Sequence, residues 1–145
     1  MKHLAKGGYR KDLKQYFRSK MEANYARYLN FDCVRWVYEL KEFEFYKIKK
    51  GNRFYKPDFY LPTADFWVEV KGYFKASDKT KLRRFKKYYP EEFKKLYFII
   101  PNKYARSKAN GEVMQFLLDD LGVGLNRIIS YKEMERYKAF IPGWE

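Results

Sequence analysis

Residues 56–72 read KPDFYLPTADFWVEVKG, and the rest of the chain can be placed around this stretch. Two apolar, aromatic arms flank a Pro-Thr-Ala-Asp turn, so the stretch predicts a β-hairpin. Because side chains alternate along a strand, Glu69 and Lys71 project together from one face of the second arm. Val68 and Val70 project from the other face, into apolar surroundings.

The length of the turn predicts the register of the hairpin. If the turn has four residues, Leu61 faces Phe66, and Asp58 then lies opposite Glu69 with Cβ atoms about 5 Å apart. Two carboxylates at that separation repel by roughly 3 kcal/mol at an effective dielectric constant of about 20. A hard divalent cation held between them would remove the repulsion, and Mg²⁺ suits such oxygen ligands. The alternative is a cross-strand charge cluster of Asp58, Glu69 and Lys71, and a bulge would change the register.

Length and composition indicate one domain, spanning residues 1–145, whose basic N-terminal segment 1–11 is expected to be flexible. The net charge of +14 favours a polyanionic partner, although it could also serve solubility alone. The chain has no apolar run near the roughly 20 residues of a membrane span. A single cysteine, Cys33, excludes an internal disulfide and a cysteine-rich zinc module, and the single histidine, His3, offers little for catalysis. A cytoplasmic location is the default expectation.

Periodicity, glycine, proline and capping residues predict the other elements. In chain order they are a helix over 12–30, strands around 35–39 and 42–47, a first hairpin arm over 53–61, a helix capped by Ser77 and followed by Pro90, a buried strand over 96–100, a basic loop over 102–110, a helix over 112–121 ended by Gly122, an edge strand over 127–129, and a last helix capped by Ser130. This order predicts an α/β fold with a mixed β-sheet flanked by helices.

Two further carboxylates could serve a site or only the fold. Glu22 ends a Ser-x-x-Glu pattern that begins at Ser19, which is the signature of a capping box at a helix start. Glu22 is therefore either a cap or a catalytic group. Glu44 is a weaker candidate, since an exposed strand residue of this kind is more often solvated.

Basic side chains gather in the helix that follows the hairpin and in the loop after the buried strand. A charge run is usually a solvated face, but the scarcity of nearby acids makes phosphate contact equally plausible. The candidate DNA-binding residues are Arg18, Lys75, Lys79, Arg83, Arg84, Lys87, Lys103 and Arg106.

Pro57-Asp58 followed by Glu69-Val70-Lys71 resembles the PD-(D/E)xK nuclease superfamily. With the upstream Arg18-Ser19 and Glu22, and with Leu61-Pro62 and Gly72, residues 15–101 resemble the bacteriophage endonuclease I type of Holliday-junction resolvase. The resemblance implies a restriction-endonuclease-like core with the site at one edge of the sheet. It implies that Asp58, Glu69 and the backbone carbonyl of Val70 hold Mg²⁺ or Mn²⁺. Lys71 would orient the attacking water and stabilise the developing charge, and Glu22 would join a second metal or bind a metal-bound water.

The sequence therefore predicts a Mg²⁺-dependent endodeoxyribonuclease with Glu22, Asp58, Glu69 and Lys71 in catalysis. No zinc finger, basic zipper or helix-turn-helix is recognisable, which favours recognition of DNA shape, such as a branched DNA or Holliday junction. By resemblance the protein is a homodimer, acting in the host cytoplasm if a phage encodes it. The alternatives are a nicking or linear-duplex nuclease of the same fold, or a non-catalytic protein that binds nucleic acid, possibly RNA.

Overall fold

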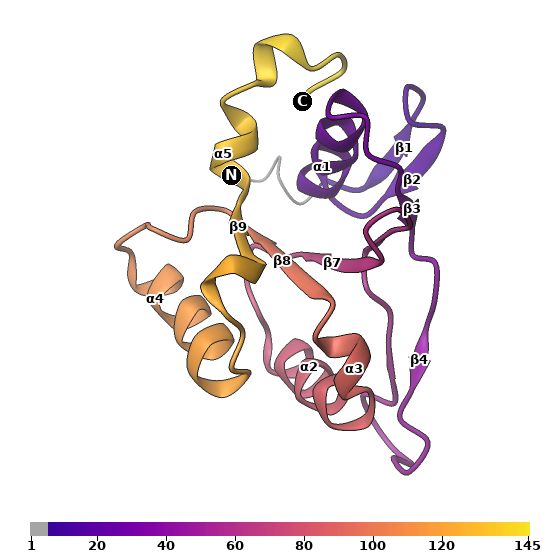
Figure 1. Ribbon diagram of the computed structural model, residues 1–145, viewed down its shortest axis with the longest axis vertical. Helices are drawn as coiled ribbons and strands as arrows, with labels where there is room; N and C mark the ends of the chain where they lie inside the picture. The colour runs from indigo at the N-terminus through magenta and orange to yellow at the C-terminus, as the bar shows by residue number, and fades with distance from the viewer. Residues whose placement is uncertain (1–5) are drawn as a thin grey trace.

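The computed structural model describes residues 6–145, and its centre is a five-stranded mixed sheet (Figure 1). The strand order is β3-β6-β7-β8-β9. These strands are β3 (Val37–Tyr38), β6 (Phe59–Leu61), β7 (Phe66–Val70), β8 (Leu96–Ile100) and β9 (Ile128–Ser130). The pairs β3/β6 and β6/β7 are antiparallel, while β7/β8 and β8/β9 are parallel. The predicted mixed sheet is confirmed, and β7, the second arm of the hairpin, is its central strand.

The hairpin of β6 and β7 has the predicted register, with Leu61 paired to Phe66. The backbone N–H of Asp65 donates to the carbonyl of Leu61 at 2.8 Å, and Asp65 adopts a positive φ of 60° to close the turn. The ladder ends at the pair Phe59 and Val68, one residue short of Asp58. Asp58 continues the interaction with its side chain, because its Oδ2 accepts the backbone N–H of Val70 at 2.7 Å.

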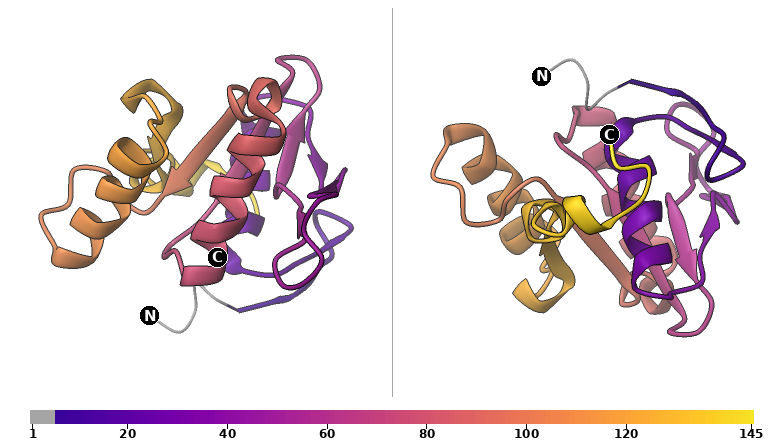
Figure 2. Two further views of the ribbon diagram at one scale, coloured as in Figure 1. Left: turned by 90° about the horizontal axis from the view of Figure 1, so that it is seen from below. Right: turned by 90° about the horizontal axis from the view of Figure 1, so that it is seen from above.

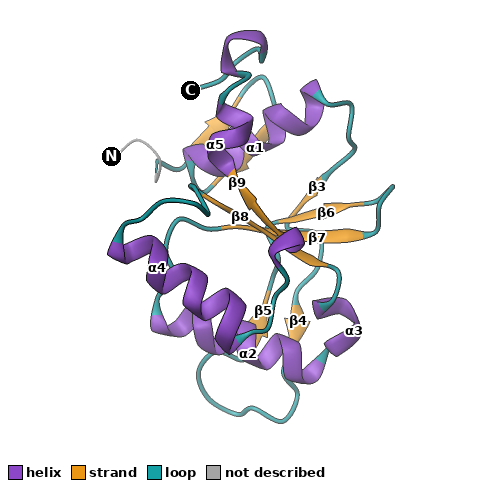
Figure 3. Ribbon diagram, turned by 60° about the vertical axis from the view of Figure 1, so that its left-hand side comes forward, coloured by secondary structure: helices purple, strands orange, loops and turns teal. Residues whose placement is uncertain are grey.

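Helices cover both faces of the sheet (Figure 3). One face packs against α1 (Lys20–Phe31) and α5 (Tyr131–Glu135), and the other packs against α2 (Ala76–Tyr88), α3 (Pro90–Phe93) and α4 (Lys108–Gln115). Val68 and Val70 belong to the first core, whereas Trp67 belongs to the second, as strand alternation predicts. The structure is thus an α/β fold consistent with a restriction-endonuclease-like core.

The first hairpin arm is shorter than predicted. Residues 53–61 split into β5 (Phe54–Tyr55) and β6, and β5 pairs with β4 (Phe43–Glu44) in a separate two-stranded ribbon. Pro57 lies in the break, where its missing N–H would interrupt a continuous ladder. The break leaves Asp58 outside any strand, with its carboxylate free to face Val70.

The N-terminal prediction was wrong, because the helix does not begin at residue 12. Residues 12–17 instead belong to a β-hairpin of β1 (Gly8–Arg10) and β2 (Gln15–Phe17), whose turn includes Lys14 at a φ of 54°. The helix starts at its N-cap, Ser19, whose hydroxyl accepts the N–H of Glu22 at 3.1 Å. Within the segment 1–11, which was expected to be flexible, residues 8–10 form β1, while residues 1–5, including His3, lie outside the described residues.

The C-terminus lies beside α1, and a network of partly buried ion pairs holds it there (Figure 2). The guanidinium of Arg27, on α1, donates to Asp12 at 2.8 Å and to Glu145 at 2.9 Å. Arg10, on β1, donates to the same Glu145 carboxylate at 2.8 Å. These contacts fix the N-terminal hairpin and the chain end against the same helix.

Smaller differences concern the ends of helices. The N-cap of α2 is Lys75 rather than Ser77, because the Asp78 carboxylate accepts the N–H of Lys75 at 2.9 Å. The predicted helix at 112–121 begins earlier, as α4, and continues as the π-turn η2 (Phe116–Asp120) before Gly122 at a φ of 67°. Short 3-10 turns, η3 (Leu125–Arg127) and η4 (Lys138–Phe140), precede β9 and the C-terminus. Among residues 6–145, no helix is both long and apolar enough to cross a bilayer.

Candidate active site

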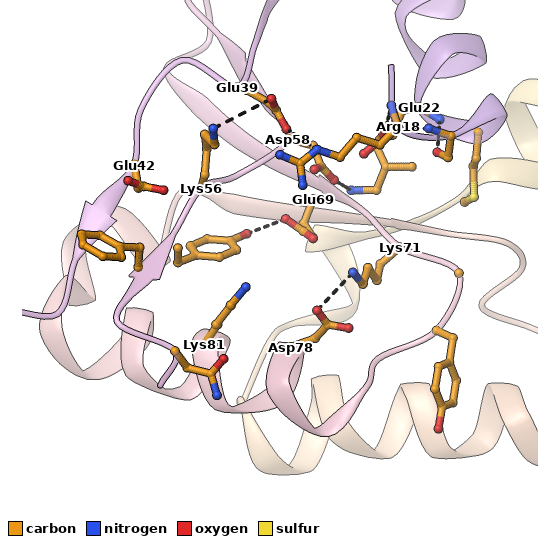
Figure 4. Close-up of a pocket in the computed structure, with 18 of the residues that line it drawn as sticks. Arg18, Glu22, Glu39, Glu42, Lys56, Asp58, Glu69, Lys71, Asp78 and Lys81 are labelled. Carbon is orange, nitrogen blue, oxygen red and sulfur yellow. Dashed lines mark hydrogen bonds and ion pairs between the residues drawn. The ribbon is translucent and has the colours of Figure 1, made fainter. Parts of the chain in front are cut away.

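A cavity of about 800 Å³ opens at the carboxyl end of β7 (Figure 4). The resemblance had implied a site at one edge of the sheet, but this cavity lies at the end of the central strand. It is lined by six residues that the sequence had singled out, namely Arg18, Glu22, Asp58, Glu69, Val70 and Lys71. These residues come from the start of α1, the segment before β6, and the end of β7, so the fold brings together positions as far apart as 18 and 71.

Asp58 and Glu69 form the acidic floor of the cavity. Both are buried, with exposed fractions of 9% and 8%. Burial raises the pKa of Glu69 to about 7, although a hydrogen bond from Tyr55 and the charge of Lys71 oppose the rise. Burial, followed by repulsion from Glu69 and Glu22, raises the pKa of Asp58 well above its usual range. Keeping these two acids ionised and buried therefore lowers the free energy of unfolding.

Lys71 supplies the positive charge beside this acidic pair. Its Nζ lies 3.2 Å from Oδ1 of Asp78, which projects from the first turn of α2 across the cavity (Figure 4). Burial alone would lower the pKa of Lys71, but Glu69 and Asp78 more than offset it and raise that pKa. Lys71 is therefore held as a cation facing the cavity.

Glu22 is the helix cap that its sequence pattern predicted, and it also lines the cavity. Its Oε1 accepts the backbone N–H groups of Arg18 and Ser19, each at 3.1 Å, which completes the predicted capping box. The same oxygen accepts the hydroxyl of Tyr38 at 3.0 Å. Glu22 also lines the cavity and contributes to the raised pKa of Asp58. Capping thus does not exclude a role at the site, and that role stays a prediction.

The donor set suits a hard cation held by few protein ligands. Among residues 6–145, no three or more Asp, Glu, His or Cys side chains are grouped closely enough to hold a metal by themselves. Asp58 and Glu69 nevertheless offer two buried carboxylates whose mutual repulsion a cation would relieve. Lys71 offsets part of this repulsion, because its charge lowers the pKa of Glu69, but its ion pair is with Asp78. A two-carboxylate site completed by a backbone carbonyl and water is compatible with this geometry.

The sequence analysis did not identify several residues that line the cavity. Tyr55 is buried, and its hydroxyl donates to Oε1 of Glu69 at 2.7 Å. Burial and the charge of Glu69 raise the pKa of Tyr55 well above its usual range, so its proton stays on the hydroxyl. Glu39 and Glu42 line the cavity, whereas Glu44, the candidate considered earlier, is exposed on β4 and is not among the lining residues. Asp78 also lines the cavity and was missed, because its ion pair with Lys71 depends on the packing of α2 against the sheet.

The candidate DNA-binding residues have diverse surroundings. Lys75, Arg83, Lys87 and Arg106 are exposed. Arg18 pairs with Glu39 at 2.9 Å on the rim of the cavity. The other three make contacts within the protein. Arg84 donates to the carbonyls of Gly51 and Asn52, and Lys103 donates to the carbonyl of Ile128. The ammonium group of Lys79 lies over the ring of Phe116. Their contact with DNA stays a prediction.

A mixed sheet covered by helices on both faces, with buried acids and a lysine at the end of its central strand, is consistent with a core of the restriction-endonuclease class. A family model described as phage endonuclease I matches residues 4–110. The chain therefore belongs to the phage endonuclease I family, and it is a nuclease with DNA as its substrate. Searches among curated proteins and among solved structures give no match.

Proposed function

We propose that this protein is a Mg²⁺-dependent endonuclease of the PD-(D/E)xK type that cuts branched DNA, in particular four-way junctions. The observation that carries this proposal is the buried pair of Asp58 and Glu69 beside Lys71 in an open cavity. Membership of the phage endonuclease I family supports it independently.

Asp58, Glu69 and the carbonyl of Val70 would hold the metal, with Mn²⁺ as a substitute. When bound, such an ion supplies charge neutralisation at the phosphate and a water that is more easily deprotonated. The Tyr55 hydroxyl donates a hydrogen bond to the Glu69 carboxylate, and the Val70 N–H donates one to the Asp58 carboxylate. Both carboxylates are thereby held in position. Lys71, anchored by Asp78, orients the attacking water and offsets the negative charge that develops on the phosphate. Glu22 would add a ligand for a second metal or for a metal-bound water.

Selectivity for branched DNA and a homodimeric assembly complete the proposal. The chain carries a net charge of +14, which favours a polyanion, but no recognisable module for reading base sequence. Cutting two opposed strands of a junction requires two active sites, which a homodimer provides. The host cytoplasm would be its place of action. A nicking or linear-duplex nuclease is the nearest alternative, and a non-catalytic binding protein is the more distant one.

A panel of labelled DNAs tests this proposal. With Mg²⁺ or Mn²⁺ the protein should cut a four-way junction faster than nicked, flap or linear DNA, and excess EDTA should abolish cutting. Ca²⁺ should support binding with little cutting, because it accepts oxygen ligands in a looser geometry. Single-turnover rates on each DNA are the measurement. Full activity in EDTA would exclude the two-carboxylate metal site, and equal rates on all DNAs would exclude branch selectivity.

The exposed cations Lys75 and Lys87, at the two ends of α2, give a second prediction. Changing both Lys75 and Lys87 to Glu should weaken DNA binding and flatten its salt dependence, because each lost phosphate contact lowers the slope by about 0.9. The double variant Lys132→Glu, Lys138→Glu changes the same charge on exposed residues near the C-terminus and serves as the control. Titrations at several salt concentrations measure both slopes, and identical slopes for the two double variants would place α2 away from the DNA.

A further inference from the structure

The β1–β2 hairpin presents two aromatic rings to solvent. Tyr9 and Tyr16 are direct cross-strand partners, so their side chains project from the same face of the ribbon. Their exposed fractions are 63% and 55%. Both rings lie on the outer face of this hairpin, which projects at the periphery beside α1 (Figures 1 and 2).

The opposite face of the hairpin is firmly anchored. Phe17 is fully buried and packs against Tyr38, with ring centroids 4.5 Å apart. Arg10 is 8% exposed and binds Glu145. The two exposed rings are therefore carried by a rigid support rather than by a loose loop. The lack of a side chain at Gly7 leaves room for Tyr16, because a Cβ at position 7 would lie 2.8 Å from the Tyr16 hydroxyl oxygen.

The chain passes from β2 directly to residues that line the proposed active site. Exposure alternates from Tyr16 through buried Phe17 to exposed Arg18, so Tyr16 and Arg18 lie on the same side of the chain. Arg18 and the adjacent Ser19 line the cavity that holds Asp58 and Glu69. At an extended rise, Tyr16 and Arg18 are separated by about 7 Å along the chain, which is within two base steps of a DNA strand.

The charge around the two rings suits a nucleic acid. Lys11 and Lys14 are exposed in the turn of the hairpin, and Arg18 is exposed at its other end. The acidic residue of the turn, Asp12, is paired with Arg27. Aromatic rings surrounded by cations are the combination that binds single-stranded nucleic acid, because the rings stack with bases while the cations contact phosphates.

We propose that Tyr9 and Tyr16 form a stacking platform for unpaired or unstacked nucleobases in the DNA strand that enters the cavity. This inference rests on the proposed function, since it places the platform beside the phosphate to be cut. In a continuous duplex the faces of the bases are covered by their neighbours. The platform therefore favours DNA in which a branch point or gap exposes bases next to the cleavage position.

The test measures binding in EDTA, where no cutting is expected. One probe is a duplex with a short single-stranded gap that contains 2-aminopurine, and the other is a fully paired duplex of the same length. Tyr9→Ala and Tyr16→Ala should each weaken binding to the gapped probe by at least about fivefold, and binding to the paired probe by less than about twofold. Tyr9→Phe and Tyr16→Phe should retain the wild-type affinity, because they keep the ring. The wild type should quench 2-aminopurine fluorescence, and the double alanine variant should not.

Phe140→Ala is the control, because Phe140 is 71% exposed near the C-terminus, outside this hairpin. Unchanged binding and quenching in the double alanine variant would overturn the inference, and so would an equal loss of affinity for both probes. A change of oligomeric state in that variant, measured by sedimentation, would assign the rings to a protein contact and overturn it as well. Failure of the wild type to cut any DNA with Mg²⁺ would instead overturn the proposed function, while selective quenching would still support base stacking.

Discussion

Glu69→Gln is expected to reduce the single-turnover cleavage rate by at least about a hundredfold, as is usual for loss of a metal ligand or a key electrostatic group. The substitution removes the negative charge but keeps the shape of the side chain. A neutral amide is a poorer ligand for a hard cation, so the metal should be lost or misplaced. The amide oxygen can still accept the Tyr55 hydroxyl, and the local packing should survive.

Asp58→Asn and Lys71→Met should lower the rate to a similar extent but should differ in stability. Asp58→Asn keeps an acceptor for the Val70 N–H and removes one of the repelling charges that raise the Asp58 pKa. It should therefore unfold at a higher temperature than the wild type in EDTA. Lys71→Met leaves Asp78 without its ion pair and should unfold somewhat earlier. The sequence analysis had not identified Asp78 as a partner of Lys71.

Glu22→Gln separates the two roles of that residue within the same set of variants. If Glu22 acts only as a cap, the variant should keep most of its stability and cut at the normal rate, because a glutamine oxygen can still accept the N–H groups of Arg18 and Ser19. If Glu22 also serves the site, the cleavage rate should fall while the protein stays folded. Gel-shift binding, single-turnover cleavage and thermal unfolding on all four variants are the measurements. A Glu69→Gln protein that cuts normally but unfolds early would eliminate the nuclease site and favour a binding protein.

The central hairpin was predictable because its signals are local. Strand alternation and a four-residue turn are properties of neighbouring residues, and they gave the observed pairing of Leu61 with Phe66. The same locality explains why Asp58, Glu69 and Lys71, which the sequence analysis grouped together, line one cavity. The buried strand β8 was also predicted with its observed bounds, since a continuous apolar run ended by Pro101 has few alternatives.

The missed features depend on contacts between distant segments. Residues 12–17 contain apolar residues at a spacing that a helix also permits, and only their pairing with residues 8–10 makes them a hairpin. Tyr55 reaches Glu69 because β5 pairs with β4 in a separate ribbon rather than continuing into β6. The ion pair of Lys71 and Asp78 requires the packing of α2 against the sheet. Pairings of this kind are set by tertiary structure, which local patterns do not encode.

Phe59→Ala should lower the free energy of unfolding by about 3–5 kcal/mol, the usual cost of removing a buried phenyl ring. Phe59 is fully buried, and its ring contacts those of Phe17, Tyr25 and Tyr38, with centroids 6.1, 5.0 and 5.3 Å away. For a domain of this size the melting temperature should fall by about 6–20 °C. The melting temperature of Phe59→Leu should fall less, because this substitution leaves a smaller cavity. Phe140→Ala, at an exposed residue, should change the free energy of unfolding by less than about 0.5 kcal/mol.

The same substitution should also lower activity at temperatures where the protein is still folded. Phe59 directly follows Asp58, and Tyr38, which packs on Phe59, donates its hydroxyl to Glu22. A cavity at residue 59 therefore loosens the support of two of the site's carboxylates at once. A misplacement of about 1 Å can cost a hundredfold in rate, so cleavage by Phe59→Ala well below its melting temperature should be measurably slower than that by Phe59→Leu. Equal rates for the two variants would show that the site is held by its hydrogen bonds alone, without the aromatic core behind it.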